Sequence, residues 1–222
     1  MKVEDVLKKI DYTLLKPNVS SHDIVRLCDE AKRYGFYAVC VNPYYVPLAS
    51  KLLKDTEIKV SSVVGFPLGA SLAEIKVAEA GRIIRLGASE IDMVMNISAF
   101  KSGDLDYVRK EIKSVKEEIG DAVLKVIIEC CYLTDDEKVL AAKICEEAGA
   151  DYVKTSTGFG SGGAVLEDVK LLRRTLSPKV KVKAAGGIKT FEQAVKFIEA
   201  GADRIGTSSG VKIAEEGFRA GK

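Results

Sequence analysis

The sequence predicts an α/β fold, a (β/α)8 TIM barrel that forms a single domain over residues 1–222. Short runs rich in β-branched and aromatic residues alternate with amphipathic segments, which is typical of parallel β-α-β units. Three of these segments end alike, because Gly87, Gly149 or Gly201 follows and an acidic residue and a new strand come next. Glycine adopts the left-handed conformation that ends a helix, and its recurrence indicates a repeated unit. Eight strands with intervening helices in 222 residues favour one closed barrel over an open sheet, and no linker or composition break indicates a second domain.

The expected barrel strands are eight β-rich runs, at residues 10–15, 37–42, 59–66, 90–96, 122–129, 152–157, 180–185 and 204–207. The clearest helical patterns between them cover residues 72–86, 105–119, 135–148, 164–176 and 191–200. In the first of these patterns, Ile75, Ala80 and Ile83 recur at the spacing of one buried helix face. Residues 1–9 are expected to form a short N-terminal helix that covers the amino-terminal end of the barrel.

Composition and charge argue against several classes of partner. The chain carries 34 basic and 32 acidic residues, and this balance indicates no nucleic-acid partner. No apolar run approaches the roughly 18 residues of a membrane span, and the first residues do not resemble a signal peptide. We therefore expect a cytoplasmic protein without membrane contact. Five cysteines without framework spacing predict reduced thiols, and a single histidine, His22, argues against a zinc site.

Two lysines lie in runs that should be buried strands, Lys154 in 152–157 and Lys183 in 180–185. Lysine is almost never fully buried without a partner, and burial lowers its pKa until it can act as a nucleophilic amine. Consecutive barrel strands pair about 4.8 Å apart, so each ammonium group would also lower the pKa of the other. This arrangement predicts a Schiff-base nucleophile, with two snorkelling lysines at strand ends as the structural alternative.

Acidic residues in two further strands are expected to face the same interior. Side chains alternate along a strand, so Asp92 shares one face with Asn96 and points into the barrel, where it either neutralises a lysine or takes part in the chemistry. Lys125 and Glu129 likewise share a face of their strand. For these two we favour a structural ion pair over a catalytic role.

Glycine clusters follow the last three predicted strands. They contain Gly158, the pair Gly186 and Gly187, and Gly206 with the nearby Ser208 and Ser209. In TIM barrels the loops after strands seven and eight commonly bind phosphate, with help from the N-terminus of the next helix. Backbone N–H groups and serine hydroxyls at these positions predict a subsite for a phosphate monoester.

With these residues assembled, the chain resembles the deoxyribose-phosphate aldolases, which are class I aldolases on a TIM barrel. The resemblance runs nearly end to end and is carried by residues 11–16, 40–43, 64–69, 90–94, 125–129, 153–158, 183–188 and 206–209. The combination of Lys-Thr-Ser-Thr-Gly at 154–158 with Lys-Ala-Ala-Gly-Gly at 183–187 is highly specific.

The resemblance implies reversible cleavage of 2-deoxy-D-ribose 5-phosphate to D-glyceraldehyde 3-phosphate and acetaldehyde, without a cofactor. It implies that Lys154 forms the Schiff base, that Lys183 perturbs its pKa, and that Asp92 belongs to the proton relay. It also implies a homo-oligomer, a dimer or a tetramer. The expected substrate- and phosphate-binding residues are Asp11, Cys40, Thr155, Gly158, Gly186, Gly187, Gly206, Ser208 and Ser209.

The chain departs from this family pattern in two places. Phe159 stands where some relatives carry a phosphate-binding lysine, and residues 217–222 contain no counterpart of the tyrosine that ends some relatives. Three alternatives stay open: a Schiff-base aldolase for another phosphorylated sugar, a sugar-phosphate isomerase or epimerase that uses carboxylates, and a non-catalytic barrel that binds a phosphate ligand.

Overall fold

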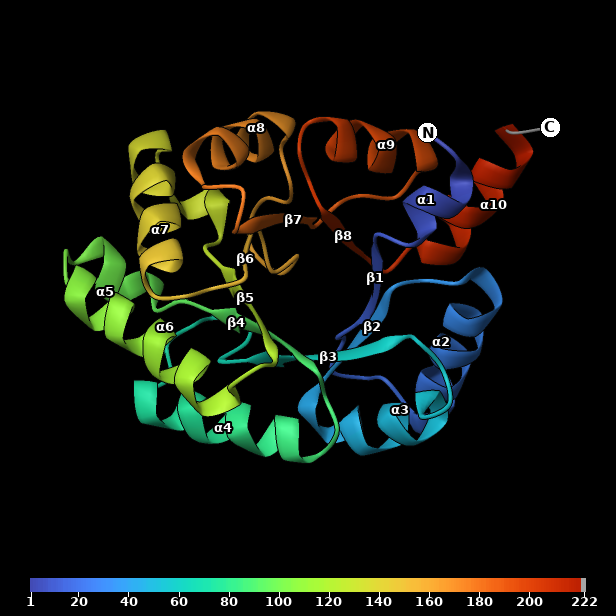
Figure 1. The fold of residues 1–222 in the computed structure, drawn as a ribbon, viewed down its shortest axis with the longest axis horizontal. Coiled ribbons are helices and arrows are strands. Elements are labelled where there is room, and N and C mark those ends of the chain that lie inside the picture. The colour runs from blue at the N-terminus through green and yellow to red at the C-terminus, as the bar shows by residue number, and fades with distance from the viewer. Residues whose placement is uncertain (221–222) are drawn as a thin grey trace.

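A computed structural model describes residues 1–220 and shows a closed barrel of eight parallel strands in chain order, with each strand hydrogen-bonded to its neighbours in sequence and β8 to β1 (Figure 1). The strands are β1 (Ile10–Leu14), β2 (Ala38–Val41), β3 (Lys59–Val64), β4 (Glu90–Val94), β5 (Val123–Ile127), β6 (Tyr152–Lys154), β7 (Lys181–Ala185) and β8 (Arg204–Thr207). The TIM-barrel prediction is therefore confirmed.

The helices form a ring around the strands (Figure 1). They are α1 (Val3–Leu7), α2 (Ser21–Tyr34), α3 (Val46–Leu53), α4 (Ala73–Arg85), α5 (Ile97–Lys101), α6 (Leu105–Ile119), α7 (Asp135–Glu147), α8 (Leu166–Thr175), α9 (Phe191–Glu199) and α10 (Gly210–Ala220), with short 3-10 turns at Pro43–Tyr45 and Cys130–Tyr132. Ser20, Thr134 and Thr190 begin α2, α7 and α9 with reciprocal capping boxes. Among the described residues, no helix is both long and apolar enough to span a membrane.

The hydrophobic core lies between the strands and the helices rather than inside the barrel. Ile91, Met93, Val126 and Val153 are fully buried members of this core. They alternate along their strands with polar residues that face the interior. The apolar contacts thus hold the ring of helices on the sheet. The inside of the barrel contains the charged groups.

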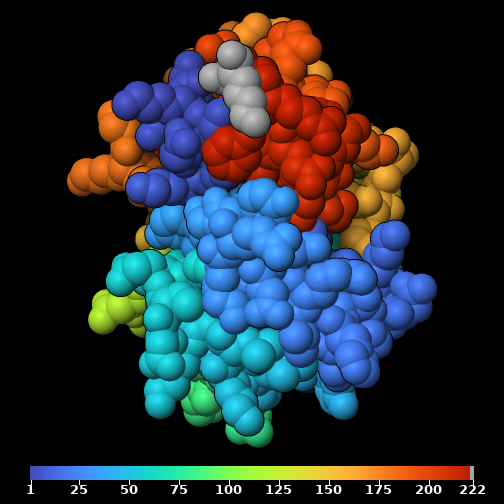
Figure 2. Space-filling model, turned by 90° about the vertical axis from the view of Figure 1, so that its right-hand side faces the viewer, coloured from blue at the N-terminus to red at the C-terminus, as the bar shows by residue number. Residues whose placement is uncertain are grey.

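The predicted N-terminal helix is present as α1, but its position differs from the expectation. Its residues Val6 and Leu7 are buried, and the helix packs against α10 at the rim of the barrel rather than across its end (Figures 1 and 2). Gly217 of α10 permits this contact, because a side chain there would collide with Val3.

Inside the barrel, the Arg204 guanidinium lies 3.2 Å from the centroid of the Tyr37 ring.

A buried ion pair between α4 and α6 holds two of the loops at the carboxyl ends of the strands. The Lys76 amine lies 2.7 Å from Glu111 Oε1 and donates to the carbonyl oxygens of Gly69, at 2.7 Å, and Val94, at 2.9 Å. The other oxygen of Glu111 accepts from the Asn96 amide at 2.9 Å. This pair therefore fixes the segments that follow β3 and β4, which lead into the face where TIM barrels carry their active sites.

Candidate active site

The centre of the barrel interior is the carboxylate of Asp92, which three lysines surround. Asp92 Oδ2 lies 2.7 Å from Lys154 Nζ and 2.8 Å from Lys183 Nζ. Asp92 Oδ1 lies 2.9 Å from Lys125 Nζ and accepts from the Ser61 hydroxyl at 3.1 Å. Lys154 and Lys183 are direct partners in the register of β6 and β7. The structure thus brings Lys154, Lys183 and Asp92 into one cluster.

The two neighbouring lysines have opposite electrostatic environments. Burial lowers the pKa of Lys154, the charge of Lys183 lowers it further, and Asp92 only partly opposes this shift. Burial also disfavours the charge of Lys183, but attraction to Asp11 and Asp92 outweighs burial and raises its pKa. Lys154 is therefore the amine that loses its proton more readily, and Lys183 keeps its charge.

Asp11 explains why Lys183 stays charged. Lys183 donates to one oxygen of Asp11, and the Arg204 guanidinium binds the other at 2.7 Å. Burial alone would raise the pKa of Asp11, but Lys183, Lys125 and Arg204 outweigh it and lower this pKa to about 2. Asp11 is thus a permanent anion beneath the lysines.

The expected ion pair between Lys125 and Glu129 does not form. Lys125 lies 2.5 Å from Glu90 Oε2 and reaches Asp92, whereas Glu129 accepts from the Thr157 amide at 3.1 Å and from its hydroxyl at 2.5 Å. The reason is the backbone of Glu129, whose φ of 53° takes it out of the strand alternation on which the expectation was based. Glu129 therefore fastens the loop after β6, and Lys125 belongs to the charged cluster.

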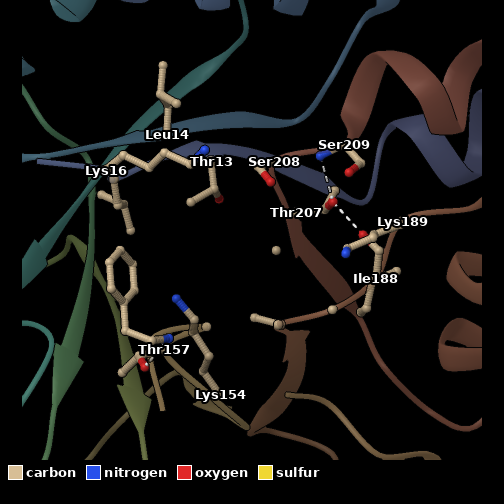
Figure 3. Close-up of a pocket in the computed structure, with 17 residues that line it drawn as sticks. Thr13, Leu14, Lys16, Lys154, Thr157, Ile188, Lys189, Thr207, Ser208 and Ser209 are labelled. Atoms are coloured by element: carbon tan, nitrogen blue, oxygen red, sulfur yellow. Dashed lines mark hydrogen bonds between the residues drawn. The ribbon is translucent and has the colours of Figure 1, made fainter. Parts of the chain in front are cut away.

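A cavity of about 290 Å³ opens above this cluster, and the Lys154 amine points into it (Figure 3). Its walls include six of the residues predicted for substrate or phosphate: Gly158, Gly186, Gly187, Gly206, Ser208 and Ser209. The other three predicted residues, Asp11, Cys40 and Thr155, are fully buried and lie outside its lining. Thr155 instead donates to the carbonyl oxygen of Ala185 at 3.2 Å.

Opposite Lys154, the loops after β7 and β8 are tied together at the wall of the cavity. The Thr207 hydroxyl donates to the Ile188 carbonyl oxygen at 2.6 Å and accepts from the Ser209 amide at 2.9 Å (Figure 3). Gly186, with a φ of 93°, packs so closely on Gly163 that a side chain would collide with it. Exposed backbone, two serines and the start of α10 make this wall suited to an anion.

Two lysines that were not among the predicted site residues also line the cavity, Lys16 and Lys189. Both side chains are exposed, so neither would be held rigidly before a ligand binds. Lys16 comes just after the carboxyl end of β1, and this position was the signal in the sequence that it could reach the site.

Comparison with known proteins agrees with this geometry. A family model described as DeoC/LacD family aldolase matches residues 6–216. The chain belongs to the DeoC/LacD family of aldolases. It is therefore an enzyme of the lyase class, in which the loops after β6, β7 and β8 surround a buried lysine.

The relatives of this DeoC/LacD aldolase match over nearly their whole length. A deoxyribose-phosphate aldolase from Thermoanaerobacter pseudethanolicus is 58% identical over 96% of both chains. Another from Thermococcus gammatolerans is 58% identical over 95% of this chain and 96% of its own. A solved structure described as "QR15, an Aldolase" is 49% identical with a TM-score of 0.94, covering 98% of this chain and 97% of its own. A deoxyribose phosphate aldolase from Aeropyrum pernix, described as a unique tetramer, is 37% identical with a TM-score of 0.90, covering 100% of this chain and 94% of its own.

One wall of the cavity in this DeoC/LacD aldolase is apolar. The Phe159 ring meets the Phe66 ring edge to face, with centroids 5.3 Å apart. Phe66 in turn packs on the small buried cluster of Leu15, Cys40 and Val63. Phe159 is 50% exposed, so it presents an apolar surface beside the path to Lys154.

Proposed function

We propose that this aldolase reversibly cleaves 2-deoxy-D-ribose 5-phosphate to D-glyceraldehyde 3-phosphate and acetaldehyde through a Schiff base on Lys154. The observation that carries the proposal is the Lys154 amine at the floor of the cavity, with a lowered pKa and a charged Lys183 beside it. The names of the relatives at 58% identity supply the choice of substrate.

In this proposal, neutral Lys154 adds to the aldehyde carbon of the open-chain sugar, and loss of water gives an iminium ion. The C3 hydroxyl then gives its proton to Asp92 through a water molecule, and the bond between C2 and C3 breaks. The bonding electron pair passes into the iminium, which becomes an enamine, and C3 leaves as the aldehyde of glyceraldehyde 3-phosphate. Protonation of the enamine carbon and hydrolysis of the iminium release acetaldehyde and restore Lys154.

Borohydride reduction in the presence of acetaldehyde tests the covalent step. Reduction of the iminium should leave one N-ethyl group on the enzyme, and peptide mapping by mass spectrometry should place it on Lys154. A modification that is spread over exposed lysines, with Lys154 unmodified, would refute the mechanism. Turnover of 2-deoxyribose 5-phosphate against other sugar phosphates then decides the substrate.

We expect the activity to fall as the pH is lowered, and the pH at which it falls should depend on Lys183. Because the charge of Lys183 lowers the pKa of Lys154, Lys183→Leu should raise that pKa and reduce the neutral fraction of Lys154 at pH 7. Each unit of increase lowers this fraction about ten-fold. Activity should fall at neutral pH and partly recover at alkaline pH, as measured by kcat/KM against pH. Undiminished activity of the variant at pH 7 would contradict this role for Lys183.

Phe159 provides a test of phosphate recognition. Phe159→Lys places a cation beside the cavity, and charge-assisted hydrogen bonds of this kind contribute about 1.5–3 kcal/mol. We expect KM for 2-deoxyribose 5-phosphate to fall about ten-fold at low salt, with little change for unphosphorylated 2-deoxyribose. Phe159→Met is the matched control, because it removes the ring without adding charge. An equal effect of Phe159→Lys on both sugars would mean that this wall does not face the phosphate.

Membership of this family also bears on the cellular location of the enzyme and on the number of copies in its assembly. We infer a cytoplasmic enzyme of two or four copies, and the tetramer described for the Aeropyrum pernix relative makes four copies the first to test. Size-exclusion chromatography with light scattering measures this directly.

A further inference from the structure

The barrel interior holds an unequal number of charges. One network of ion pairs there joins the carboxylates of Asp11, Glu90 and Asp92 to the cations of Lys125, Lys154, Lys183 and Arg204. Glu129 is also buried but lies outside this network, because it bonds to Thr157. The seven residues of the network are 5% exposed or less. Three anions face four cations, so the interior is balanced only when one cation is neutral. Burial of a net charge is costly, and the group that can most easily lose its proton is the one that does so.

Lys125 and Glu90 are members of this group that do not contact Lys154 and have no assigned role in the reaction. Neither lines the cavity above Lys154. Lys125 lies between two carboxylates, 2.9 Å from Asp92 Oδ1 and 2.5 Å from Glu90 Oε2. Glu90 also faces Arg204, with 3.3 Å between Glu90 Oε1 and Arg204 Nη2. The two can influence the reaction through Asp92, which Lys125 contacts, and through Asp11, which lies 3.8 Å from Lys125 and also binds Arg204.

We propose that Lys125 and Glu90 are positioning residues that set, by the charge they place beneath Asp92, the pH at which Lys154 becomes a neutral nucleophile. This rests on the proposed function, in which Lys154 forms the Schiff base. The two oxygens of Asp92 have different partners, because one binds Lys125 and the other binds Lys154 and Lys183. The charge of Lys125 weakens the stabilisation that Asp92 gives to a charged Lys154. The negative charge of Glu90 in turn reduces this effect of Lys125.

Every strand of the barrel contributes a group to this balance. Asp92 of β4, Lys183 of β7 and Cys40 of β2 act on Lys154 directly, and contacts among the other groups extend the cluster to Asp11 of β1, Ser61 of β3, Glu90 of β4, Lys125 of β5 and Arg204 of β8. Burial raises the pKa of the Cys40 thiol, so this thiol stays neutral over the working range. Asp11 and Asp92 stay charged because their pKa values are lowered. Lys154 is thus the group that titrates when a neighbour is changed.

The test uses two single variants whose effects should have opposite signs. Lys125→Met removes a cation and should move the midpoint of Lys154 trapping by acetaldehyde and borohydride to higher pH. Glu90→Gln removes an anion and should move it to lower pH. A shift of one pH unit corresponds to about a ten-fold change in trapping rate below the midpoint. The double variant removes one charge of each sign, so its midpoint should lie between those of the single variants.

Two controls separate this role from a structural one. Lys125→Arg keeps the charge and should keep the wild-type midpoint even if its rate falls. Lys138→Met breaks another partly buried ion pair, with Asp168 on α8, and should leave the midpoint unchanged because it lies outside the barrel interior. If Lys125→Met does not fold, Glu90→Gln and the charge-balanced double variant still give the comparison.

The outcomes distinguish the two proposals. Midpoints of Lys125→Met and Glu90→Gln that coincide with the wild type, or that shift in the same direction, overturn the role of this charged pair while leaving the Schiff base intact. Failure of the wild-type enzyme to trap acetaldehyde on Lys154 at any pH instead overturns the proposed function itself. Opposite shifts, with an intermediate double variant, support the charge balance.

Discussion

Replacing Lys154 with Met is expected to lower kcat/KM for 2-deoxyribose 5-phosphate by at least about 10³-fold, because the variant has no amine to form the iminium. The barrel should nevertheless remain folded. Lys154 is one of four buried cations that face three carboxylates, so its removal balances the interior. Asp92 still has Lys125 and Lys183 as partners at 2.9 Å and 2.8 Å. Loss of activity without loss of stability is the signature to look for.

This experiment pairs steady-state kinetics with urea unfolding on the same preparations. Lys170→Met is a suitable control, because Lys170 is half exposed on α8 and far from the interior. Activity retained in Lys154→Met would favour an isomerase or epimerase that uses carboxylates. A wild-type enzyme that binds the phosphate sugar tightly, without turnover or a trapped adduct, would favour a non-catalytic barrel.

Replacing Lys76 with Met should cost about 3–5 kcal/mol of unfolding free energy, which is typical when one partner of a buried pair is removed. Lys76 is fully buried, forms an ion pair with Glu111 and donates to the carbonyl oxygens of Gly69 and Val94. Met fills the space but donates no hydrogen bond, so a buried carboxylate and two carbonyl groups lose their partner. Equilibrium urea unfolding followed by circular dichroism measures the loss.

Two further variants sharpen this prediction. The double variant Lys76→Met with Glu111→Leu should recover much of the stability, since replacing both partners of a buried pair by apolar residues is often neutral. Lys113→Met, which breaks an exposed pair with Glu117 on the same helix as Glu111, should change stability by no more than about 1 kcal/mol. Equal losses in Lys76→Met and Lys113→Met would show that the buried pair contributes little.

The fold could be predicted from the sequence because its main signals are periodic. Eight strand patterns alternate with helical ones, and glycine ends three of the helices in the same way, so the barrel and its strand order followed directly. The strand ends could not be placed as well. Residues 155–157 and Glu129 have strand-like composition but belong to loops, where tertiary hydrogen bonds such as that from Thr157 to Glu129 determine the backbone.

The candidate site could be predicted where a single residue was unusual for its place in the sequence. A lysine inside a β-rich run is unusual, so Lys154 and Lys183 attracted attention by themselves. Alternation gives the face of a side chain but not its partners on other strands, which depend on the register of neighbouring strands and on the position of strands across the barrel. For that reason Lys125 was assigned to Glu129 rather than to Glu90, and Arg204 was overlooked. Lys76 resembled any exposed helical lysine.

The charges of the interior are divided along the chain. All three interior carboxylates come from β1 and β4, in the first half of the barrel, and all four interior cations come from β5 to β8, in the second half. Either half-barrel alone would gather buried charges of one sign, and a symmetric barrel made of two copies of either half would do the same. The halves are therefore electrostatic complements, and each supplies the counter-ions without which the other cannot close.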